Sequence, residues 1–281
     1  MRRSAYLAGA WYPADENDCR LAIEGHAAEA KVEQGQWRGI IGPHAGWTFS
    51  GDAAGRSYRW LAEAQPTVDL VVMIGSHRGP TGPNTVFRGD AWETPLGAIP
   101  TALATADRLA GELDLSDEPI SPGRPDNAVE LHLPFVRHFF PNADMLMLGV
   151  ADSPTAIAIG RSVGRAANEG SDNAVFVGST DLTHYGPNYG FSPAGGGDDA
   201  IAWVRNENDK GFIDAILARD PEAVVQHGVA NHSACCSGAV VATMAAVAAY
   251  GGTEAPRLVD HYLSCDVQRG SSFVGYAGIV L

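Results

Sequence analysis

The chain has 281 residues, of which 45% are hydrophobic, and its formal net charge is -14. This composition allows a core of normal size, in one large α/β domain or two small ones. The negative charge argues against nucleic acid and anionic membrane as partners, because both require a basic face.

The N-terminal segment, the apolar stretches and the cysteines indicate the cellular compartment. No apolar run follows Arg2 and Arg3 as in a signal peptide, and no apolar stretch reaches the length of a membrane-spanning helix. The four cysteines form neither the disulfide framework of a secreted domain nor a Cys-x-x-Cys zinc pattern. We therefore expect a protein of the reducing cytoplasm.

The first half of the chain predicts strands that alternate with helices. In chain order we expect a helix over residues 16–32 capped by Asp15, a strand ending at His44, a helix over 51–63, a strand over 68–74, a loop over 79–97 and a helix over 103–113. The strand over 68–74 is a continuous apolar run, which is typical of a strand buried on both faces.

The second half continues this alternation. We expect a loop over 121–125, a strand over 145–150, a helix over 154–168, a strand over 174–178, a loop over 187–197, helices over 198–219, 221–226 and 239–250, and strands over 258–263 and 273–280. Such alternation predicts one mainly parallel sheet with helices on both faces. No shift in composition marks a linker, so we expect a single α/β domain over 1–281.

Histidines recur directly after the predicted strands. His44 and His77 follow two of them, a third is followed by Asp181 and His184, and Cys235 stands near the start of a helix. The carboxyl ends of parallel strands meet at one edge, so these side chains can lie close together. Two imidazoles and one anionic ligand form a facial triad, which leaves positions on a metal open. A thiolate can be the anionic member, since a helix N-terminus lowers the pKa of a cysteine.

Each of these residues also has an ordinary explanation. A histidine in an α/β loop usually makes structural hydrogen bonds or faces solvent, and a cysteine in an alanine-rich helix start is usually a small buried residue. Asp181 can be a carboxylate that caps a loop. Taken singly, therefore, none of these signals specifies a metal site.

Several short motifs match one known family in order along the chain. They are AGAWYP at 8–13, PHAG at 43–46, GSH at 75–77, ETPLG at 93–97, ELHLPF at 130–135, STDLTHYG at 179–186, AC at 234–235 and SFVGYA at 272–277. On these motifs the chain resembles the Memo family. The resemblance implies a fold similar to that of the LigB-type, class III extradiol dioxygenases, which use non-heme Fe(II).

The resemblance also implies roles for particular residues. Memo-like proteins hold their metal with two histidines and a cysteine, and the matching residues here are His44, His77 and Cys235. The residue that resembles the acid/base histidine of the dioxygenases is His184, with Asp181 beside it to set its tautomer. Fe(II) is the expected cofactor, and copper or zinc is the alternative because thiolate also suits these metals.

Three features depart from the family pattern. Asp126 and Asn127 stand where the family usually has Glu-His, which predicts the loss of a polar group near the pocket. Cys236 stands in place of a glycine; successive helix residues point about 100° apart, so we expect Cys235 and not Cys236 to face the ion. His232 is outside the pattern and is expected to be a solvated loop residue, with a fourth ligand or a proton carrier as the alternatives.

These observations predict a non-heme iron enzyme that acts on O2 and a small electron-rich molecule, with His184 moving a proton. Two other functions remain open. One is a metal- or peptide-binding module with a signalling or redox role and no turnover, and the other is a metal-dependent hydrolase that uses zinc-bound water. Asp181 and His184 favour chemistry over binding, since a binding scaffold needs neither.

Overall fold

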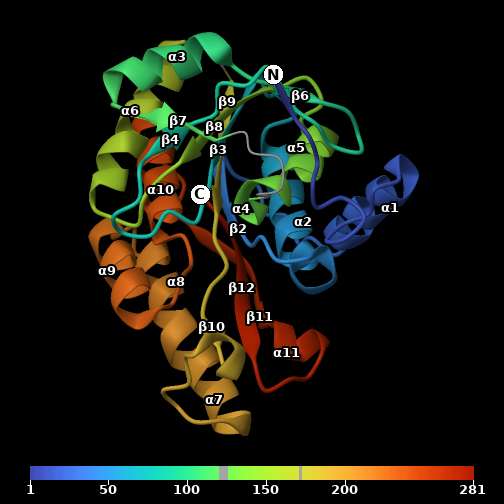
Figure 1. Ribbon diagram of the computed structural model, residues 1–281, viewed down its shortest axis with the longest axis vertical. Helices are drawn as coiled ribbons and strands as arrows, with labels where there is room; N and C mark the ends of the chain where they lie inside the picture. The colour runs from blue at the N-terminus through green and yellow to red at the C-terminus, as the bar shows by residue number, and fades with distance from the viewer. Residues whose placement is uncertain (120–125, 171–172) are drawn as a thin grey trace.

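The structure is a computed structural model that describes residues 1–119, 126–170 and 173–281. The loop expected over 121–125 lies outside the described residues. Within the described residues, nine strands form a mixed central sheet (Figure 1). Its middle is parallel and consists of β2 (Gly39–Gly42), β9 (Ala174–Ser179), β3 (Leu70–Ile74) and β8 (Asp144–Gly149).

Shorter or antiparallel strands extend this middle on both sides. Beyond β2 lie β12 (Phe273–Val280), β11 (Arg257–Leu263) and β10 (His184–Tyr185), and beyond β8 lie β4 (Thr85–Val86) and β7 (Ser116–Asp117). A small second sheet contains β1 (Arg2–Arg3), β5 (Ala91–Trp92) and β6 (Ile99–Pro100). The sequence predicted a loop where β4 and β5 occur, because two-residue strands are too short to show a periodic pattern.

Helices cover both faces of the sheet, as predicted (Figure 1). Alternate side chains of β3 point to opposite faces, so Val71 and Met73 join one hydrophobic core while Val72 and Ile74 join the other. The first core is covered by α1 (Glu16–Ala27), α2 (Trp47–Ala64), α4 (Asn127–Glu130) and α5 (Leu133–Phe139). The second is covered by α3 (Leu103–Glu112), α6 (Thr155–Glu169), α8 (Asp209–Leu217), α9 (Pro221–Asn231) and α10 (Ser237–Tyr250).

Several helix bounds differ from the predicted ones. Asp15 caps α1 as expected, but α1 ends at Ala27 rather than at residue 32, and Ala30 and Val32 pack on the core outside the helix. The helix expected over 198–219 consists of α7 (Gly197–Trp203), a π-helical turn (Val204–Asn208) and α8. A 3-10 turn (Pro187–Tyr189) and α11 (Ser264–Val267) complete the elements.

The helices α6 and α10 pack in direct contact. Gly160 and Gly164 of α6 lie so close to α10 that an added Cβ would overlap the carbonyl oxygens of Ala242 and Ala246. Small residues therefore allow the two backbones to touch. No helix in these described ranges is long and apolar enough to cross a bilayer.

Candidate functional site

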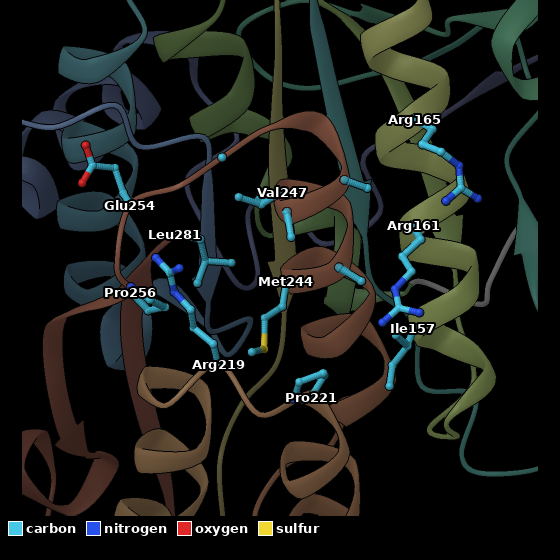
Figure 2. A pocket seen from close by; sticks show the side chains of 14 residues that line it. Ile157, Arg161, Arg165, Arg219, Pro221, Met244, Val247, Glu254, Pro256 and Leu281 are labelled. Carbon is cyan, nitrogen blue, oxygen red and sulfur yellow. The ribbon is translucent and has the colours of Figure 1, made fainter.

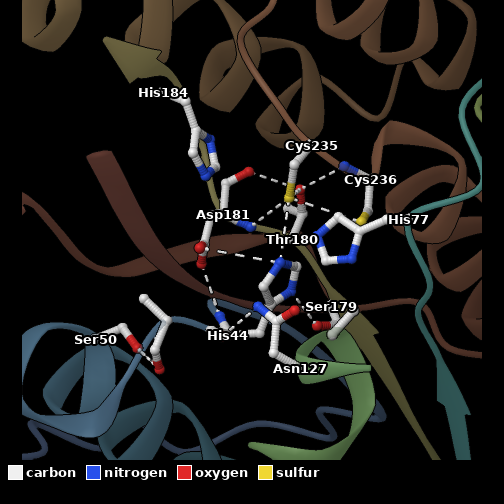
Figure 3. A network of polar contacts seen from close by, with 12 residues as sticks. His44, Ser50, His77, Asn127, Ser179, Thr180, Asp181, His184, Cys235 and Cys236 are labelled. Atoms are coloured by element: carbon white, nitrogen blue, oxygen red, sulfur yellow. Dashed lines mark hydrogen bonds and ion pairs between the residues drawn. The ribbon is translucent and has the colours of Figure 1, made fainter. Parts of the chain in front are cut away.

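Four side chains that can bind a metal converge beyond the carboxyl ends of β2 and β3. One donor atom from each of His44, His77, Cys235 and Cys236 lies within 4.8 Å of the others. Cys235 Sγ is 3.3 Å from His44 Nε2, and the rings of His44 and His77 meet edge-on with centroids 4.9 Å apart (Figure 3). Imidazole and thiolate donors at this spacing fit a first-row transition metal.

A buried hydroxyl orients His44. His44 follows β2, and Ser179 ends β9, the strand paired with β2. The Ser179 hydroxyl contacts His44 Nδ1 at 2.7 Å, which leaves Nε2 of His44 facing the sulfur atoms. The His44 backbone N–H donates to Asp181 Oδ1 at 2.7 Å. Burial opposes a charge on His44, but the neighbouring Asp181 and Cys235 raise its pKa.

His132 supports this arrangement, although no role was expected for it from the sequence. Its Nε2 lies 3.0 Å from the same Ser179 hydroxyl, and its Nδ1 lies 3.2 Å from the Tyr58 hydroxyl. Burial, reinforced by His44, lowers the pKa of His132 to about 3, so this ring stays neutral. The ELHLPF motif was the available signal, but a motif does not show that Ser179 joins two imidazoles.

Asp126 and Asn127 both contact the site, so the predicted loss of a polar group is wrong. Asp126 Oδ1 lies 3.6 Å from Nδ1 of His77 and, together with Cys235, raises the pKa of His77 to about 10. Ser76 donates a hydrogen bond to Asp126. Asn127 Nδ2 donates to the His44 carbonyl at 3.1 Å. The pair differs from the family residues in type but still supplies polar contacts to both histidines.

Both neighbouring thiols face the cluster, which corrects the prediction that Cys236 would point away. The helix α10 begins at Ser237 and Cys236 is its N-cap residue, so the 100° rotation between helix residues does not apply. The backbone N–H of Cys235 donates to the Asp181 carbonyl, and that of Cys236 donates to Thr180 Oγ1. These bonds fix residues 235–236 against the loop that follows β9.

The same contacts set the charge of Cys235. Burial disfavours a thiolate, but hydrogen bonding with Cys236, His44 and His77 and the charge of His44 outweigh it and lower the Cys235 pKa well below its usual value. The Asp181 N–H also donates to Cys235 Sγ, at 3.3 Å. The thiolate is therefore favoured by these neighbours, more than by the helix N-terminus that the sequence suggested.

His184 lies beyond Asp181 and is tethered by the backbone. Its Nδ1 contacts the Leu182 carbonyl at 3.1 Å; a carbonyl can only accept, so Nδ1 carries the hydrogen, and Nε2 makes no hydrogen bond within the described residues. The Leu182 carbonyl, and not Asp181, therefore sets the tautomer. Asp181 is buried and contacts His44 instead, with Oδ2 3.9 Å from Nε2.

Comparison with known proteins agrees with the family motifs found in the sequence. A model of the family described as Memo-like protein matches residues 3–280. The chain belongs to the Memo-like family. MEMO1 family proteins of Methanopyrus kandleri and Pyrococcus furiosus are each 30% identical to it, over 100% of this chain and 99% of each relative. The crystal structure of an uncharacterized Escherichia coli K12 protein shares the fold, with a TM-score of 0.52, 14% identity, and coverage of 86% of this chain and 99% of that one.

Two cavities of this Memo-like protein meet at His184. The larger, of about 730 Å³, is lined by Asp181 and His184 together with Asn127, Arg269 and the aromatic residues Trp11, Phe49, Tyr189 and Tyr276. The smaller, of about 380 Å³, is lined by His184, Cys235 and His232. His232 is exposed and packs against Phe191, as expected for a loop histidine. His184 and Tyr189 line both cavities.

A third cavity lies elsewhere in this Memo-like fold, between α6 and α10. Its volume is about 460 Å³, and Arg161, Arg165 and Arg219 surround an apolar floor (Figure 2). Its lining residues include no histidine, cysteine or aspartate. It therefore lacks the donor atoms that the histidine and cysteine cluster provides.

A second buried carboxylate fixes the loop that carries His184. Asp209, which follows the π-helical turn, accepts a hydrogen bond from the Thr183 backbone N–H at 3.1 Å. Its other oxygen lies 3.1 Å from His261 Nε2. No sequence pattern indicates these contacts, because residues 183, 209 and 261 meet only in the folded chain.

Proposed function

We propose that this Memo-like protein is a non-heme iron-dependent oxidoreductase that resembles the class III extradiol dioxygenases, with Fe(II) held by His44, His77 and Cys235. The observation that carries the proposal is the convergence of these three donors beside a cavity that also contains His184. Bound Fe(II) would supply open positions for O2 and an electron-rich substrate. Copper and zinc fit the same donors and are the alternative metals.

The residues around the donors would orient them before any metal arrives. Ser179 directs Nε2 of His44 toward the sulfur atoms, and Asp126 lies beside Nδ1 of His77. Such outer partners hold a ligand ring in place and set its tautomer. The network therefore supports binding with little rearrangement of side chains.

His184 would carry the proton in the reaction. Because Nδ1–H is engaged by the Leu182 carbonyl, Nε2 can accept a proton from a substrate hydroxyl and later return it. His184 lines both cavities, so a substrate in the larger one can reach it. Asp181 stays close enough to His44 to stabilise positive charge at the site.

The larger cavity suits a small molecule. Its volume of about 730 Å³ lies in the range of ordinary ligand pockets, and its aromatic lining favours a flat, electron-rich compound. The acidic chain is not suited to nucleic acid or an anionic membrane. We place the protein in the cytoplasm, since Cys19, Cys235, Cys236 and Cys265 are all free thiols.

Anaerobic reconstitution with Fe(II), followed by O2-uptake measurements on catechols and other electron-rich compounds, tests the proposal. We expect iron-dependent O2 uptake with at least one class of compound, and its loss in His44→Ala. Iron bound at the site without uptake on any of them would instead support a metal-binding module with no turnover. The second thiol, Cys236, favours this second candidate, because a fourth protein donor reduces the room for substrate.

A further inference from the structure

Cys236 has no counterpart in the family motif, which has glycine after the metal-binding cysteine. Its side chain is buried, and its Sγ lies 3.7 Å from Cys235 Sγ and 3.5 Å from the Ser76 carbonyl oxygen. The function proposed above takes Cys235 as its one sulfur ligand and does not place Cys236 on the metal.

The spacing of the donors matches a four-coordinate site. Two thiolates that each lie about 2.3 Å from a tetrahedral ion are about 3.8 Å apart, and a thiolate and an imidazole nitrogen are about 3.6 Å apart. The observed distances are 3.7 Å between the two sulfur atoms and 3.3 Å between Cys235 Sγ and His44 Nε2. The remaining donor distances stay within 4.8 Å, so side-chain shifts of about 1 Å would bring all four donors to tetrahedral spacing.

The backbone holds Cys236 in this position. Its N–H donates to Thr180 Oγ1 at 3.1 Å, and the next turn is held by Asp152, which accepts from the Gly238 N–H at 2.7 Å. As the N-cap residue, Cys236 has φ -141° and ψ 55°, outside the helical range, so its side chain turns toward Cys235. The position is therefore built by the fold and does not depend on a flexible loop.

We propose that Cys236 is a fourth metal ligand, which gives this chain a His2Cys2 donor set for a thiophilic divalent cation. The proposal rests on the proposed function only for the other three ligands. Two thiolates favour tetrahedral zinc or cobalt. A tetrahedral ion in this set has no open position, whereas an octahedral Fe(II) keeps some, so the identity of the metal would decide whether substrate can bind.

Co²⁺ is a suitable probe because its spectrum reports both thiolate number and geometry. The full-length protein would be titrated with Co²⁺ under reducing conditions as wild type, Cys235→Ser, Cys236→Ser and Cys236→Gly. Cys265→Ser is the matched control, since that buried thiol packs in a separate cluster. Thermal melts of each metal-free variant identify any that fail to fold, and the glycine variant restores the family residue at an N-cap position that tolerates it.

In the wild type we expect d–d bands of a tetrahedral ion and a thiolate charge-transfer band. The intensity of the charge-transfer band should fall to about half in both Cys236 variants. Their affinity for Co²⁺ should fall at least about 10-fold, because replacing even a residue that only hydrogen-bonds to a ligand lowers metal affinity by that factor. An unchanged spectrum in both Cys236 variants, with the band lost in Cys235→Ser, would overturn the fourth ligand and leave the proposed function intact. A wild type without a thiolate band would overturn both.

Discussion

Ser179 links a candidate ligand to the protein interior through a single hydroxyl. Ser179→Ala would leave His44 Nδ1 and His132 Nε2 without this partner. We expect metal affinity to fall about 10- to 100-fold, as for other outer partners of a ligand. The free energy of unfolding should fall by about 1–3 kcal/mol, because buried polar groups lose a hydrogen bond. Zn²⁺ titration calorimetry and urea unfolding measure the two effects.

Ser57→Ala is the matched control for that variant. Ser57 is also buried, but its hydroxyl donates to the Ala53 carbonyl within α2. We expect a loss of stability without a loss of metal affinity. Equal metal affinity in both variants would contradict the orienting role of Ser179.

His184→Ala separates proton transfer from structure. We expect bound metal to stay nearly unchanged and turnover to fall by about 100-fold or more, because the free Nε2 is removed. His232→Ala is the control, since it lines the smaller cavity at an exposed position and should change turnover little. Metal analysis and a thermal melt on the same samples distinguish a role in proton transfer from a structural role. If stability and metal content collapse together, His184 is a structural residue.

At the scale of elements, the contact between α6 and α10 brings two helix backbones together. In Gly160→Ala the added methyl would overlap the Ala242 carbonyl, and we expect a loss of about 1–3 kcal/mol, as for overpacked cores. Gly111→Ala in α3 meets open space and should be neutral or stabilising by up to about 1 kcal/mol. Urea unfolding compares the two. Similar values would mean that α10 can move away from α6 at little cost.

Long periodic or apolar elements could be predicted from the sequence, and two-residue strands could not. β3 and β8 were predicted within two residues, because a strand buried on both faces is a continuous apolar run. β4 and β5 were missed because two residues carry no period. The prediction that Cys236 points away from the ion was wrong because α10 begins only at Ser237, so Cys235 and Cys236 do not follow helical geometry.

At the scale of the whole molecule, the positions of residues at strand ends indicated which of them could meet. Their actual contacts depend on the folded structure. The parallel order of β2, β9 and β3 brings His44, Ser179 and His77 to one edge, as chain alternation implied. The hydroxyl bridge to His132 and the Leu182 contact of His184 depend on side-chain directions, which no sequence pattern records. Their assignment therefore required the structure.

Glu130 ties the N-terminal segment to the rest of the molecule and should make stability depend on pH. Its buried carboxylate accepts from the Leu7 N–H at 2.5 Å and the Tyr12 hydroxyl at 3.0 Å. Burial outweighs these bonds and raises its pKa above the ordinary 4.5. The folded state therefore holds this proton more tightly than the unfolded state, so the stability from Glu130 is present below pH 4.5 and is lost as pH rises through the folded pKa.

Glu130→Gln removes this titration and keeps an oxygen acceptor. We expect the free energy of unfolding of the variant, relative to wild type, to increase as pH rises from 4 toward neutrality. Urea unfolding of both proteins at a series of pH values measures the difference. A difference that stays constant across the series would show that Glu130 titrates alike in the folded and unfolded chains.

The central claim is that His44, His77 and Cys235 bind one metal ion, and metal-edge X-ray absorption on the Fe(II)-loaded protein tests it most directly. We predict a sulfur shell near about 2.3 Å together with imidazole nitrogens near about 2.1 Å, and loss of sulfur scattering when the thiolates of Cys235 and Cys236 are both replaced by serine. A first shell of nitrogen and oxygen atoms without sulfur in the wild type would contradict the claim.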